Sequence, residues 1–527
     1  MTSSNDAAPR PIVVDAAGAS AADAAAITAG IPSRALMRCA GAAAAAEIAH
    51  RFPGLLGDGV VIATGAGNNG GDGWVVAQWL RTAGIATRVV ECAPALTTDA
   101  RAEREAAVGM GVPVATALRT LDDGHERLVV DALIGTGYRA ATELQAPMAN
   151  AVASLVRRAS QGATIISLDV PSGLNASTGD SRGGLRAALT ITFGTVKRGH
   201  LVARELCGEI VALDIGLGAH VGVAKGAPLA DARWFRAMLP RIAADAHKGT
   251  RGKVAIVGGS KGMAGATILA ARAALHSGAG LVKCVVAPES LPPLQEAVPA
   301  SLAGAWPPDN DSAHRDIGEW ADAVLIGPGL GREHARAIVM RVLGEFRGPV
   351  VLDADALNAF AGDADALAPL LRDRPALLTP HPAEFARLAG NGATVEEVLA
   401  DRFEWPARLA ARTGAAVLLK GTPTVVAAQS GESTVVAEGT PILATGGAGD
   451  LLGGIAVTLL AQLRDGALAG ALAAFAHGRA ATSVSAREVR GHTLDDVVRE
   501  LAGMWTLQPA LPRPPVIAEL PLVGEAR

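Results

Sequence analysis

The stretch LATGGAGDLLGGI, from Leu443 to Ile455, combines residue types that can support phosphoryl transfer. It lies between a predicted strand end and an apolar run with helical character. At a helix N-terminus, the backbone N–H groups of Gly447, Ala448 and Gly449 could converge on an anion, assisted by the helix dipole. Asp450 would then be placed to take a proton from an attacking hydroxyl. The alternative is that the glycines only allow tight packing and that Asp450 only caps the helix.

Three further loops in the second half of the chain follow apolar runs that are typical of buried strands. They are GPGLG (Gly327 to Gly331), TPHPAEF (Thr379 to Phe385) and LLKGTPTVV, which contains Lys420. Taken singly, Lys420 could be a solvated lysine and His381 part of a rigid turn. Because ligand sites in open α/β sheets gather at the carboxyl ends of strands, the four loops together favour a nucleotide or phosphate site.

In the first half, the segment GAGNNG (Gly65 to Gly70) matches G-x-G-x-x-G between a predicted strand and a predicted helix. Glu91 follows about 20 residues later, as a dinucleotide fingerprint requires, so a dehydrogenase is one alternative. The string continues as NNGGDGW, however, and two amides with Asp72 make a loop more polar than a pyrophosphate turn needs. The pattern therefore favours a different ligand.

Three other polar side chains of the first half supply hard oxygen atoms near strand ends. They are Asn69, Asp131 in VDALIGTG and Ser172 in LDVPSGLN. Oxygen ligands suit alkali or alkaline-earth cations, and a single carboxylate favours a large monovalent ion over Mg²⁺. For each residue alone, turn or cap chemistry is the alternative.

The elements that must position these residues follow an α/β pattern in both halves. Short apolar runs alternate with amphipathic helical segments, which predicts βαβ units and mainly parallel sheets. The expected organisation is an N-terminal domain over residues 1–225, a second domain over residues 231–507 and a proline-rich tail over residues 508–527. We expect the tail to pack poorly.

Composition limits the classes of function. A chain of 527 residues, half of them hydrophobic and 19% charged, can fill two cores and is not typical of a disordered protein. The formal net charge of −4 and the lack of a Lys/Arg block disfavour nucleic acid and membrane surfaces as partners. Four scattered cysteines without a CxxC pair indicate reduced thiols. Without a signal-peptide pattern or a bilayer-spanning apolar run, we expect a cytoplasmic location.

These motifs resemble two families. In the second half, VGGSKGMAGA, GPGLG, VLDADALN, LTPHPAEF, KGTPTVV and TGGAGDLLGG resemble the ribokinase-like NAD(P)H-hydrate dehydratases. In the first half, GIPSRALMRCAG, NNGGDG, DALIGTG, DVPSGLN and VALDIGLG resemble the NAD(P)H-hydrate epimerases. The resemblance implies a Rossmann-like three-layer α/β/α domain followed by a ribokinase-like α/β domain, as in bifunctional NAD(P)H-hydrate repair enzymes.

For the second half, the resemblance implies that ADP drives loss of water from the S epimer of hydrated NADH or NADPH (NADHX or NADPHX). The products would be NAD(P)H, AMP and phosphate, with Asp450 assisting attack of the hydrate hydroxyl on the β-phosphate. Glu384 would position a hydrated Mg²⁺. The hydrate would be bound by Gly265, Ala266, Gly329, His381 and Asp450, and the nucleotide by Lys420, Gly421, Thr422, Pro423, Thr424, Gly447, Ala448 and Gly449. One departure is KGMAGA, which lacks the tyrosine or proline that relatives often carry near the glycine.

For the first half, the resemblance implies interconversion of the R and S hydrates, with Asp169 as the acid/base group. Potassium would be bound near Asn69, Asp131 and Ser172. The hydrate would be held by Asn68, Asn69, Gly70, Gly71, Asp72, Gly135, Thr136, Gly137, Tyr138, Arg139 and Asp169. The expected partners are small molecules, and we expect a homo-oligomer. The alternatives are a sugar or vitamin kinase with an appended nucleotide-binding domain, and a non-catalytic nucleotide-binding protein.

Overall fold

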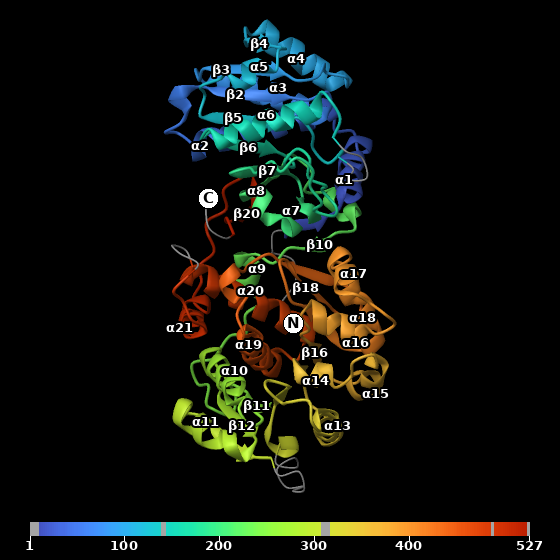
Figure 1. Cartoon of the computed structure of the whole chain (residues 1–527), viewed down its shortest axis with the longest axis vertical. Coiled ribbons are helices and arrows are strands. Elements are labelled where there is room, and N and C mark those ends of the chain that lie inside the picture. Colours follow the sequence, from blue (N-terminus) through green and yellow to red (C-terminus); the bar gives the residue numbers. More distant parts are fainter. Residues whose placement is uncertain (1–9, 139–143, 307–316, 486–489, 524–527) are drawn as a thin grey trace. The chain divides into compact units, whose positions relative to one another are not determined.

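The chain folds into two compact α/β units (Figure 1). The computed structural model describes residues 10–138, 144–306, 317–485 and 490–523. Unit 1 is formed by Met1–Pro228 together with Leu511–Arg527, and unit 2 by Leu229–Ala510. Each unit has a mainly parallel sheet with helices on both faces, so the expected two-domain α/β fold class is confirmed.

The sheet of unit 1 has the strand order β20-β9-β7-β6-β5-β2-β3-β4. All neighbours are parallel except β20, which runs antiparallel to β9. The strands are β2 (Val60–Thr64), β3 (Thr87–Glu91), β4 (Val114–Ala115), β5 (Leu128–Ala132), β6 (Thr164–Leu168), β7 (Leu189–Phe193), β9 (Glu209–Leu213) and β20 (Val516–Leu520). From β2 the chain first adds β3 and β4 on one side. It then returns to place β5 on the other side of β2 and continues outward through β6, β7 and β9. The strand order therefore reverses between β2 and β5, where ligands bind in open α/β sheets.

Successive side chains of a strand point to opposite faces of a sheet. Both faces of this sheet are apolar, and helices cover each of them. Val60 and Ile62 face a core formed with α2 and α3, whereas Val61 faces the core on the side of α6. The helices of unit 1 are α1 (Ala16–Thr28), α2 (Ser33–Arg51), α3 (Asn68–Thr82), α4 (Thr98–Gly109), α5 (Arg119–Asp122), α6 (Met148–Ser160), α7 (Arg198–Val202) and α8 (Arg204–Cys207). A small sheet of β10 (Ala227–Pro228), β1 (Ile12–Val14) and β8 (Val196–Lys197) completes the unit.

The sheet of unit 2 has the order β13-β12-β11-β14-β15-β16-β17-β18-β19. It is parallel from β13 to β17 and ends in the antiparallel strands β18 and β19. The strands are β11 (Lys253–Val257), β12 (Leu281–Val286), β13 (Leu302–Ala305), β14 (Ala323–Ile326), β15 (Val350–Leu352), β16 (Ala376–Leu378), β17 (Ala416–Leu419), β18 (Thr424–Ala427) and β19 (Ser433–Val436).

Two hydrophobic cores lie on the two faces of this sheet. Val254 and Ile256 pack toward α10, α19, α20 and α21, whereas Ala255 and Val257 pack toward the opposite helices. The helices of unit 2 whose bounds lie within the described residues are α9 (Ala232–Met238), α10 (Ala264–His276), α11 (Leu291–Ala297), α13 (Ala335–Glu345), α14 (Asp355–Asn358), α15 (Ala368–Leu371), α16 (Pro382–Ala389), α17 (Val395–Ala400), α18 (Trp405–Thr413), α19 (Ala448–Leu463), α20 (Gly466–Val484) and α21 (Leu494–Met504). The sequence loops with polar motifs follow the carboxyl ends of β11, β14, β15, β16 and β17.

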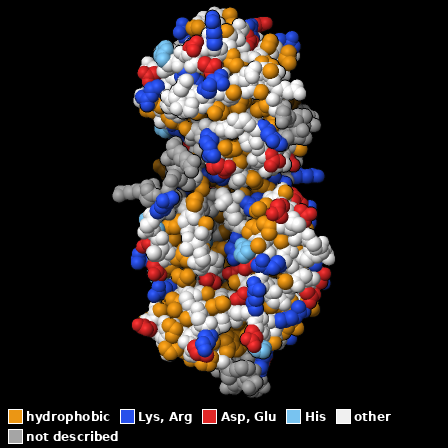
Figure 2. All heavy atoms as spheres, in the orientation of Figure 1, with side chains coloured by type: hydrophobic (Ala, Val, Ile, Leu, Met, Phe, Trp, Pro, Cys, Tyr) orange, Lys and Arg blue, Asp and Glu red, His pale blue; other side chains and the backbone are white. Residues whose placement is uncertain are grey.

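The surface carries charges of both signs. On the face drawn in Figure 2, Lys and Arg side chains are interspersed with Asp and Glu. Among the described residues, no helix is both long and apolar enough to cross a bilayer.

The proline-rich tail differs from the sequence-based expectation, because part of it is an ordered strand of unit 1. Residues Val516–Leu520 form β20, which pairs with β9 at the edge of the sheet. The prediction that the tail packs poorly was therefore wrong. The prolines precede the strand or follow it, and an edge strand needs backbone partners on one side only.

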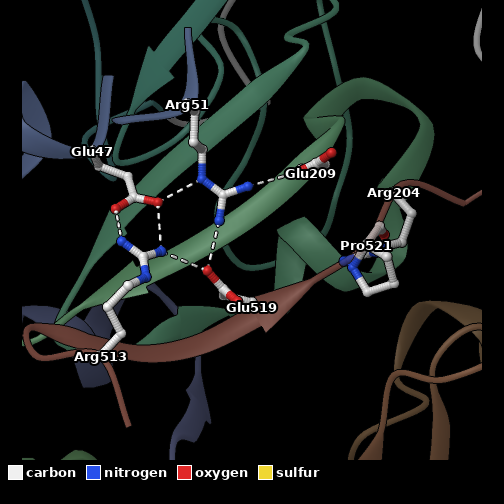
Figure 3. Close-up of polar contacts among 7 residues, drawn as sticks. All are labelled: Glu47, Arg51, Arg204, Glu209, Arg513, Glu519 and Pro521. Carbon is white, nitrogen blue, oxygen red and sulfur yellow. Dashed lines mark hydrogen bonds and ion pairs between the residues drawn. The ribbon is translucent and has the colours of Figure 1, made fainter. Parts of the chain in front are cut away.

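Ion pairs hold this strand against α2 (Figure 3). Arg513 donates from both terminal nitrogens to Glu47 at 2.7 and 2.9 Å, and it also contacts Glu519 at 2.7 Å. Arg51 joins Glu209 and Glu519 at 2.6 Å each. Burial alone would raise the pKa of Glu47, but the hydrogen bonds and charges of Arg513 and Arg51 lower it below its usual value. This contribution to stability is present above the pKa of an unfolded glutamate and is lost as the pH falls through the lower folded value.

We expect Arg513→Gln to loosen β20 locally, because it removes charge-assisted hydrogen bonds from Glu47, whose side chain is 4% exposed. The remaining contact with Arg51 limits the cost to roughly 1–2 kcal/mol. Hydrogen exchange of the β9 and β20 amides should quicken. Arg157→Gln is the matched control, because Arg157 makes a similar pair with Asp122 at an exposed site. Equal protection in the parent and Arg513→Gln would show that the ion pairs do not hold the strand.

Candidate functional site

A cavity of about 660 Å³ lies in unit 1 beside the point where the strand order reverses. The structure brings most of the expected residues of the first half to its wall. The lining includes Asn68, Asn69, Asp72, Gly135, Thr136, Gly137 and Asp169, together with Asp23, Thr195 and Lys197. Tyr138 is buried but is not part of this lining, and Arg139 lies outside the described residues.

Two of the expected binding residues, Gly70 and Gly71, do not line the cavity. A Cβ atom at Gly70 would lie 2.1 Å from the carbonyl oxygen of Gly65, and one at Gly71 would lie 2.5 Å from the Cε atom of Met37. Close packing of α3 against the backbone of the preceding loop explains glycine at position 70, whereas the atoms nearest to position 71 belong to the flexible end of the Met37 side chain. The N-terminal turn of α3 instead presents Asn68, Asn69 and Asp72 to the cavity.

Asp169 lies directly after β6 and forms an ion pair with Lys197. The Nζ atom of Lys197 is 2.6 Å from Oδ1 of Asp169, and the lysine side chain is only 2% exposed. The amide of Thr136 donates to Oδ2 of Asp169 at 3.2 Å. Burial opposes ionisation of Asp169, but the Lys197 charge and hydrogen bond lower its pKa below the ordinary value. Asp169 is therefore a carboxylate at neutral pH.

His200 fixes the backbone of Asp169. Its Nδ1 accepts the amide proton of Lys197 at 3.2 Å, so Nε2 carries the proton and donates to the carbonyl of Asp169 at 2.9 Å. Burial and the Lys197 charge lower the pKa of His200 to about 3, which keeps the ring neutral. Asp169 has φ of +62°, a left-handed conformation that costs energy for a non-glycine residue.

Two further carboxyl groups of the cavity, those of Asp72 and Asp23, have raised rather than lowered pKa values. The pKa of Asp72 is raised well above its ordinary value by burial and by the charges of Asp169 and Asp23. The pKa of Asp23 is also raised, mainly by burial, although the charge of Lys197 opposes the shift. One cavity thus holds an ionised aspartate beside others that retain protons more easily, which is the arrangement that separates a base from an acid.

Two of the expected cation ligands, Asp131 and Ser172, are in direct contact. Ser172 Oγ donates to Asp131 Oδ1 at 2.6 Å, and the Ser172 amide donates to Oδ2 at 2.9 Å. Burial raises the pKa of Asp131, and these hydrogen bonds oppose the shift. Asn69 is buried, with no hydrogen-bond partner for either atom of its side-chain amide. Among the described residues, no group of three or more His, Cys, Asp or Glu side chains could hold a metal ion.

Glu91, which matched the dinucleotide fingerprint in the sequence, is engaged elsewhere. Arg104 donates from Nε and a terminal nitrogen to the two carboxylate oxygens of Glu91, at 2.7 and 3.0 Å. Both oxygens that would contact a ribose are therefore already paired, which disfavours the dehydrogenase alternative.

In unit 2, Lys420 lies at the centre of a carboxylate cluster. Its Nζ atom is 2.8 Å from Oδ1 of Asp353 and 3.9 Å from Oε2 of Glu384. Burial would lower the pKa of Lys420, but the charges of Asp353 and Glu384 raise it above the ordinary value. Asp353 follows β15 and is buried, so the lysine compensates a charge that would otherwise be costly there.

Asp450 lies in the first turn of α19, as the sequence predicts. Burial and the charge of Asp353 raise its pKa to about 7, although Lys420 opposes the shift. Gly449 lies close to the lysine, because a Cβ atom there would lie 3.0 Å from Lys420 Nζ. Gly447 precedes the helix with φ of +95°, which favours glycine. The helix terminus therefore places two glycines beside a carboxyl group whose pKa lies near neutral, while the amide of Ala448 donates to the Thr445 carbonyl at 3.2 Å.

His381 caps α16 within the loop after β16. Its Nδ1 accepts from the amides of Ala383 and Glu384 at 3.2 and 3.3 Å, while Glu384 Oε2 accepts from the His381 amide at 3.0 Å. Burial lowers the pKa of His381, although Glu384 opposes the shift. The neutral ring thus holds its proton on Nε2, which lies 3.4 Å from Oε1 of Glu384.

Gly329 and the start of α10 are brought together, as expected for a shared binding surface. Gly329 has φ of +57°, and a Cβ atom there would lie 2.8 Å from the Met263 carbonyl and 3.1 Å from the Cβ of Ala266. Gly265 has no neighbouring atom where its Cβ would project. The loop that contains Gly329 and the start of α10 are therefore in close contact.

The KGTPT loop is held by a residue that sequence reasoning did not identify. Arg402 is buried, and its Nη1 atom donates to the carbonyl of Thr422 and, at 3.4 Å, to that of Pro423. Thr424 closes the loop by donating from Oγ1 to the Gly421 carbonyl at 3.0 Å. The loop is thus rigidly connected to the end of β17 and to Lys420.

Sequence reasoning also missed Lys197, Asp23 and the role of Asp353. A lysine in the apolar segment ITFGTVK is a detectable signal, since an unpaired lysine would be costly inside a core. Asp353 belongs to the motif VLDADALN, but the sequence does not indicate that its ion-pair partner is Lys420. No local pattern marks Asp23, because only the folding of α1 against the cavity gives it a role.

Comparison with known families agrees with the division into two units. The family described as YjeF-related protein N-terminus matches residues 33–199, and the family described as NAD(P)H-hydrate dehydratase matches residues 254–502. The crystal structure of an ADP/ATP-dependent NAD(P)H-hydrate dehydratase from Bacillus subtilis, co-crystallised with ATP and Mg²⁺, is 28% identical. It covers 54% of this chain and 99% of its own, with a TM-score of 0.46.

Similarity to curated proteins extends over both units. The bifunctional NAD(P)H-hydrate repair enzyme Nnr of Moorella thermoacetica is 37% identical over 85% of this chain and 88% of its own length. The proteins of the same name from Escherichia coli and Salinibacter ruber are each 36% identical. They cover 81% and 88% of this chain, and 81% and 90% of their own. The chain belongs to the family of bifunctional NAD(P)H-hydrate repair enzymes.

Proposed function

We propose that unit 1 interconverts the R and S epimers of NADHX and NADPHX, and that unit 2 removes water from the S epimer with ADP as co-substrate. The observation that carries the proposal is the helix terminus of α19, where Asp450 has a pKa of about 7 and the neighbouring Gly449 lies close to Lys420. The test mixes the R,S hydrate with the protein, ADP and Mg²⁺, and follows NADH absorbance. Full recovery requires both activities, whereas a small-molecule kinase would leave a stable phosphorylated acceptor.

In unit 2, ionised Asp450 accepts the proton of the hydrate hydroxyl as its oxygen attacks the β-phosphorus of ADP. The new O–P bond replaces the bond to AMP, which leaves. The phosphorylated carbon then loses phosphate, and loss of a ring proton restores the reduced nicotinamide. The amides at Gly447 and Gly449 support negative charge on the phosphates, and Lys420 adds a cation beside them. The amide of Ala448 donates to the Thr445 carbonyl at 3.2 Å, so it would have to exchange this partner for a phosphate oxygen. Gly265, Ala266, Gly329 and His381 bind the hydrate, and residues 420–424 bind the nucleotide.

Magnesium would be held at Glu384 together with the nucleotide. Mg²⁺ prefers oxygen ligands and commonly binds through one or two carboxylates plus phosphates, which fits the carboxylates around Lys420. When bound, the ion would supply charge neutralisation of the phosphates. The chain's own contribution is to hold Glu384 through the amide of His381.

In unit 1, protonated Asp72 donates to the leaving C6 hydroxyl, and Asp169 accepts a proton from the water that returns on either face. The C6–O bond breaks with formation of water and a cationic ring, and a new C6–O bond forms with release of one proton. The raised pKa of Asp72 and the lowered pKa of Asp169 support these roles. Lys197 orients Asp169 and keeps it ionised.

Potassium would be held near Asn69, Asp131 and Ser172 in unit 1. The support is the buried, unpartnered amide of Asn69, together with a single buried carboxylate at Asp131. When bound, the ion would orient the hydrate electrostatically. The proposal also includes a cytoplasmic location for the protein. It further includes assembly of the chain into a homo-oligomer.

Asp450→Asn should reduce dehydration by about 10² to 10⁴ while ADP binding survives, because the amide keeps the shape but cannot accept the proton. In the parent, kcat/KM on the S hydrate should rise as the pH passes through about 7, since Asp450 acts in its ionised form. The exposed Asp363→Asn is the matched control. Near-parental turnover by Asp450→Asn would reject the assigned base.

Asp169→Ala should stop conversion of R to S without affecting dehydration of purified S hydrate. With a racemic mixture, NADH recovery should slow sharply once the S fraction is consumed, leaving spontaneous epimerisation. Asp180→Ala, at an exposed turn of the same unit, is the control. Repair of the whole mixture at the parental rate would refute the role of Asp169.

Dialysis into potassium-free buffer with a large organic cation should slow epimerisation, and added KCl should restore it. The ADP-dependent step on the S hydrate should not respond. Asn69→Leu should lose the potassium response and weaken hydrate binding in an equilibrium titration. An unchanged response in this variant would remove Asn69 from the proposed site.

A further inference from the structure

A second cavity, of about 820 Å³, opens in unit 2 at the edge of the sheet opposite Asp450. Arg251 lies just before β11, Gly278 lies between α10 and β12, and Gln462 lies in the last turn of α19. Because β11 to β17 run parallel, the amino ends of the strands at this cavity are remote from the carboxyl ends near Asp450. The cavity is therefore separate from the proposed dehydratase site.

Its wall is strongly positive. Four arginines, Arg233, Arg236, Arg241 and Arg251, line it, and no Asp or Glu does. Within the described ranges, none of the four forms an ion pair. Arg236 donates to the carbonyl of Trp505 at 3.0 Å and Arg251 to that of Gly278 at 3.2 Å, which holds both guanidinium groups at the wall. Uncompensated like charges repel one another, so an anion would be bound favourably.

A buried hydroxyl at the same wall also lacks a partner. Ser277 is 6% exposed, and its Oγ atom makes no hydrogen bond to the protein. A buried polar group without a partner is unfavourable unless a ligand or water satisfies it. This observation is independent of the arginines and points to a polar ligand.

An aromatic ring forms another part of the wall. Trp505 is held by a hydrogen bond from its indole nitrogen to the His276 carbonyl at 2.7 Å, and it stacks on Phe235 at a centroid distance of 6.3 Å. Leu239 and Ile242 add apolar surface. The cavity volume is within the range of about 300 to 1,000 Å³ that is typical of small-molecule sites. Arginines beside a fixed indole suit phosphate groups attached to a planar base.

We propose that this cavity is a second binding site for a phosphate-bearing nucleotide, distinct from the site near Asp450. Arg233 and Arg251 contact the phosphates, Ser277 Oγ hydrogen-bonds to the ligand, and Trp505 contacts the base. Bidentate arginine contacts to phosphate are strong and geometrically specific.

The test is equilibrium dialysis of the full chain against ADP, with stoichiometry measured at low ionic strength. We expect two ADP molecules per chain in the parent. Removal of both charges in the double variant Arg233→Gln/Arg251→Gln should weaken one of the two sites by at least about tenfold. Arg499→Gln, at an exposed ion pair on α21, is the matched control and should retain both.

Inorganic pyrophosphate tests the phosphate recognition directly. It should displace the second ADP from the parent, and rising salt should weaken that site. The double variant should still recover NADH from S hydrate at the parental rate with saturating ADP, which shows that unit 2 is folded. One ADP per chain in the parent, two in the double variant at unchanged affinity, or no displacement by pyrophosphate would each overturn the proposal. The expected stoichiometry rests on the proposed function for one of the two ADP molecules. Loss of pyrophosphate-sensitive ADP binding in the double variant tests the second site alone, whereas NADH recovery tests the proposed function.

Discussion

Each unit buries a lysine against an aspartate at the carboxyl edge of its parallel sheet, and the chemistry of both sites depends on this pair. Lys197 holds Asp169 at 2.6 Å in unit 1, and Lys420 holds Asp353 at 2.8 Å in unit 2. For Asp169, burial alone would disfavour the charged form, and the Lys197 charge and hydrogen bond lower its pKa below the ordinary value. Lys420 supplies the matching positive charge beside buried Asp353. The sheet supplies the location, since the carboxyl ends of parallel strands meet at one edge.

The two pairs have different consequences for neighbouring carboxyl groups. In unit 1, the paired aspartate is itself the ionised group, and its charge raises the pKa of Asp72. In unit 2, the charge of paired Asp353 instead raises the pKa of Asp450 to about 7. A Lys–Asp ion pair therefore accompanies a carboxylate of lowered pKa in one unit and a carboxyl group with a pKa near neutral in the other.

The C-terminal strand links the two ends of the chain within unit 1. β20 pairs with β9, and Arg513 joins Glu47 on α2, so residues more than 450 positions apart in sequence stabilise one sheet edge. Unit 2 is consequently an insertion between two segments of unit 1. β20 thereby becomes the edge of the sheet, and short edge strands with flanking prolines are less prone to pair with another chain.

By itself, the sequence determined the α/β class, the two units, the family and the helix-terminal position of Asp450, because these depend on local periodicity, glycine patterns and contiguous motifs. Only the tertiary structure decided the partners. Lys197, Asp23 and Asp353 have partners that are distant in sequence. Gly70 and Gly71 lie outside the lining of the cavity although their motif resembles a binding loop. The proline-rich tail became a strand because the edge of β9 and the carboxylate of Glu47 offered it partners. The local sequence pattern indicates which secondary structure a segment can form. Its burial and its charged partners depend on which distant segments the fold packs against it.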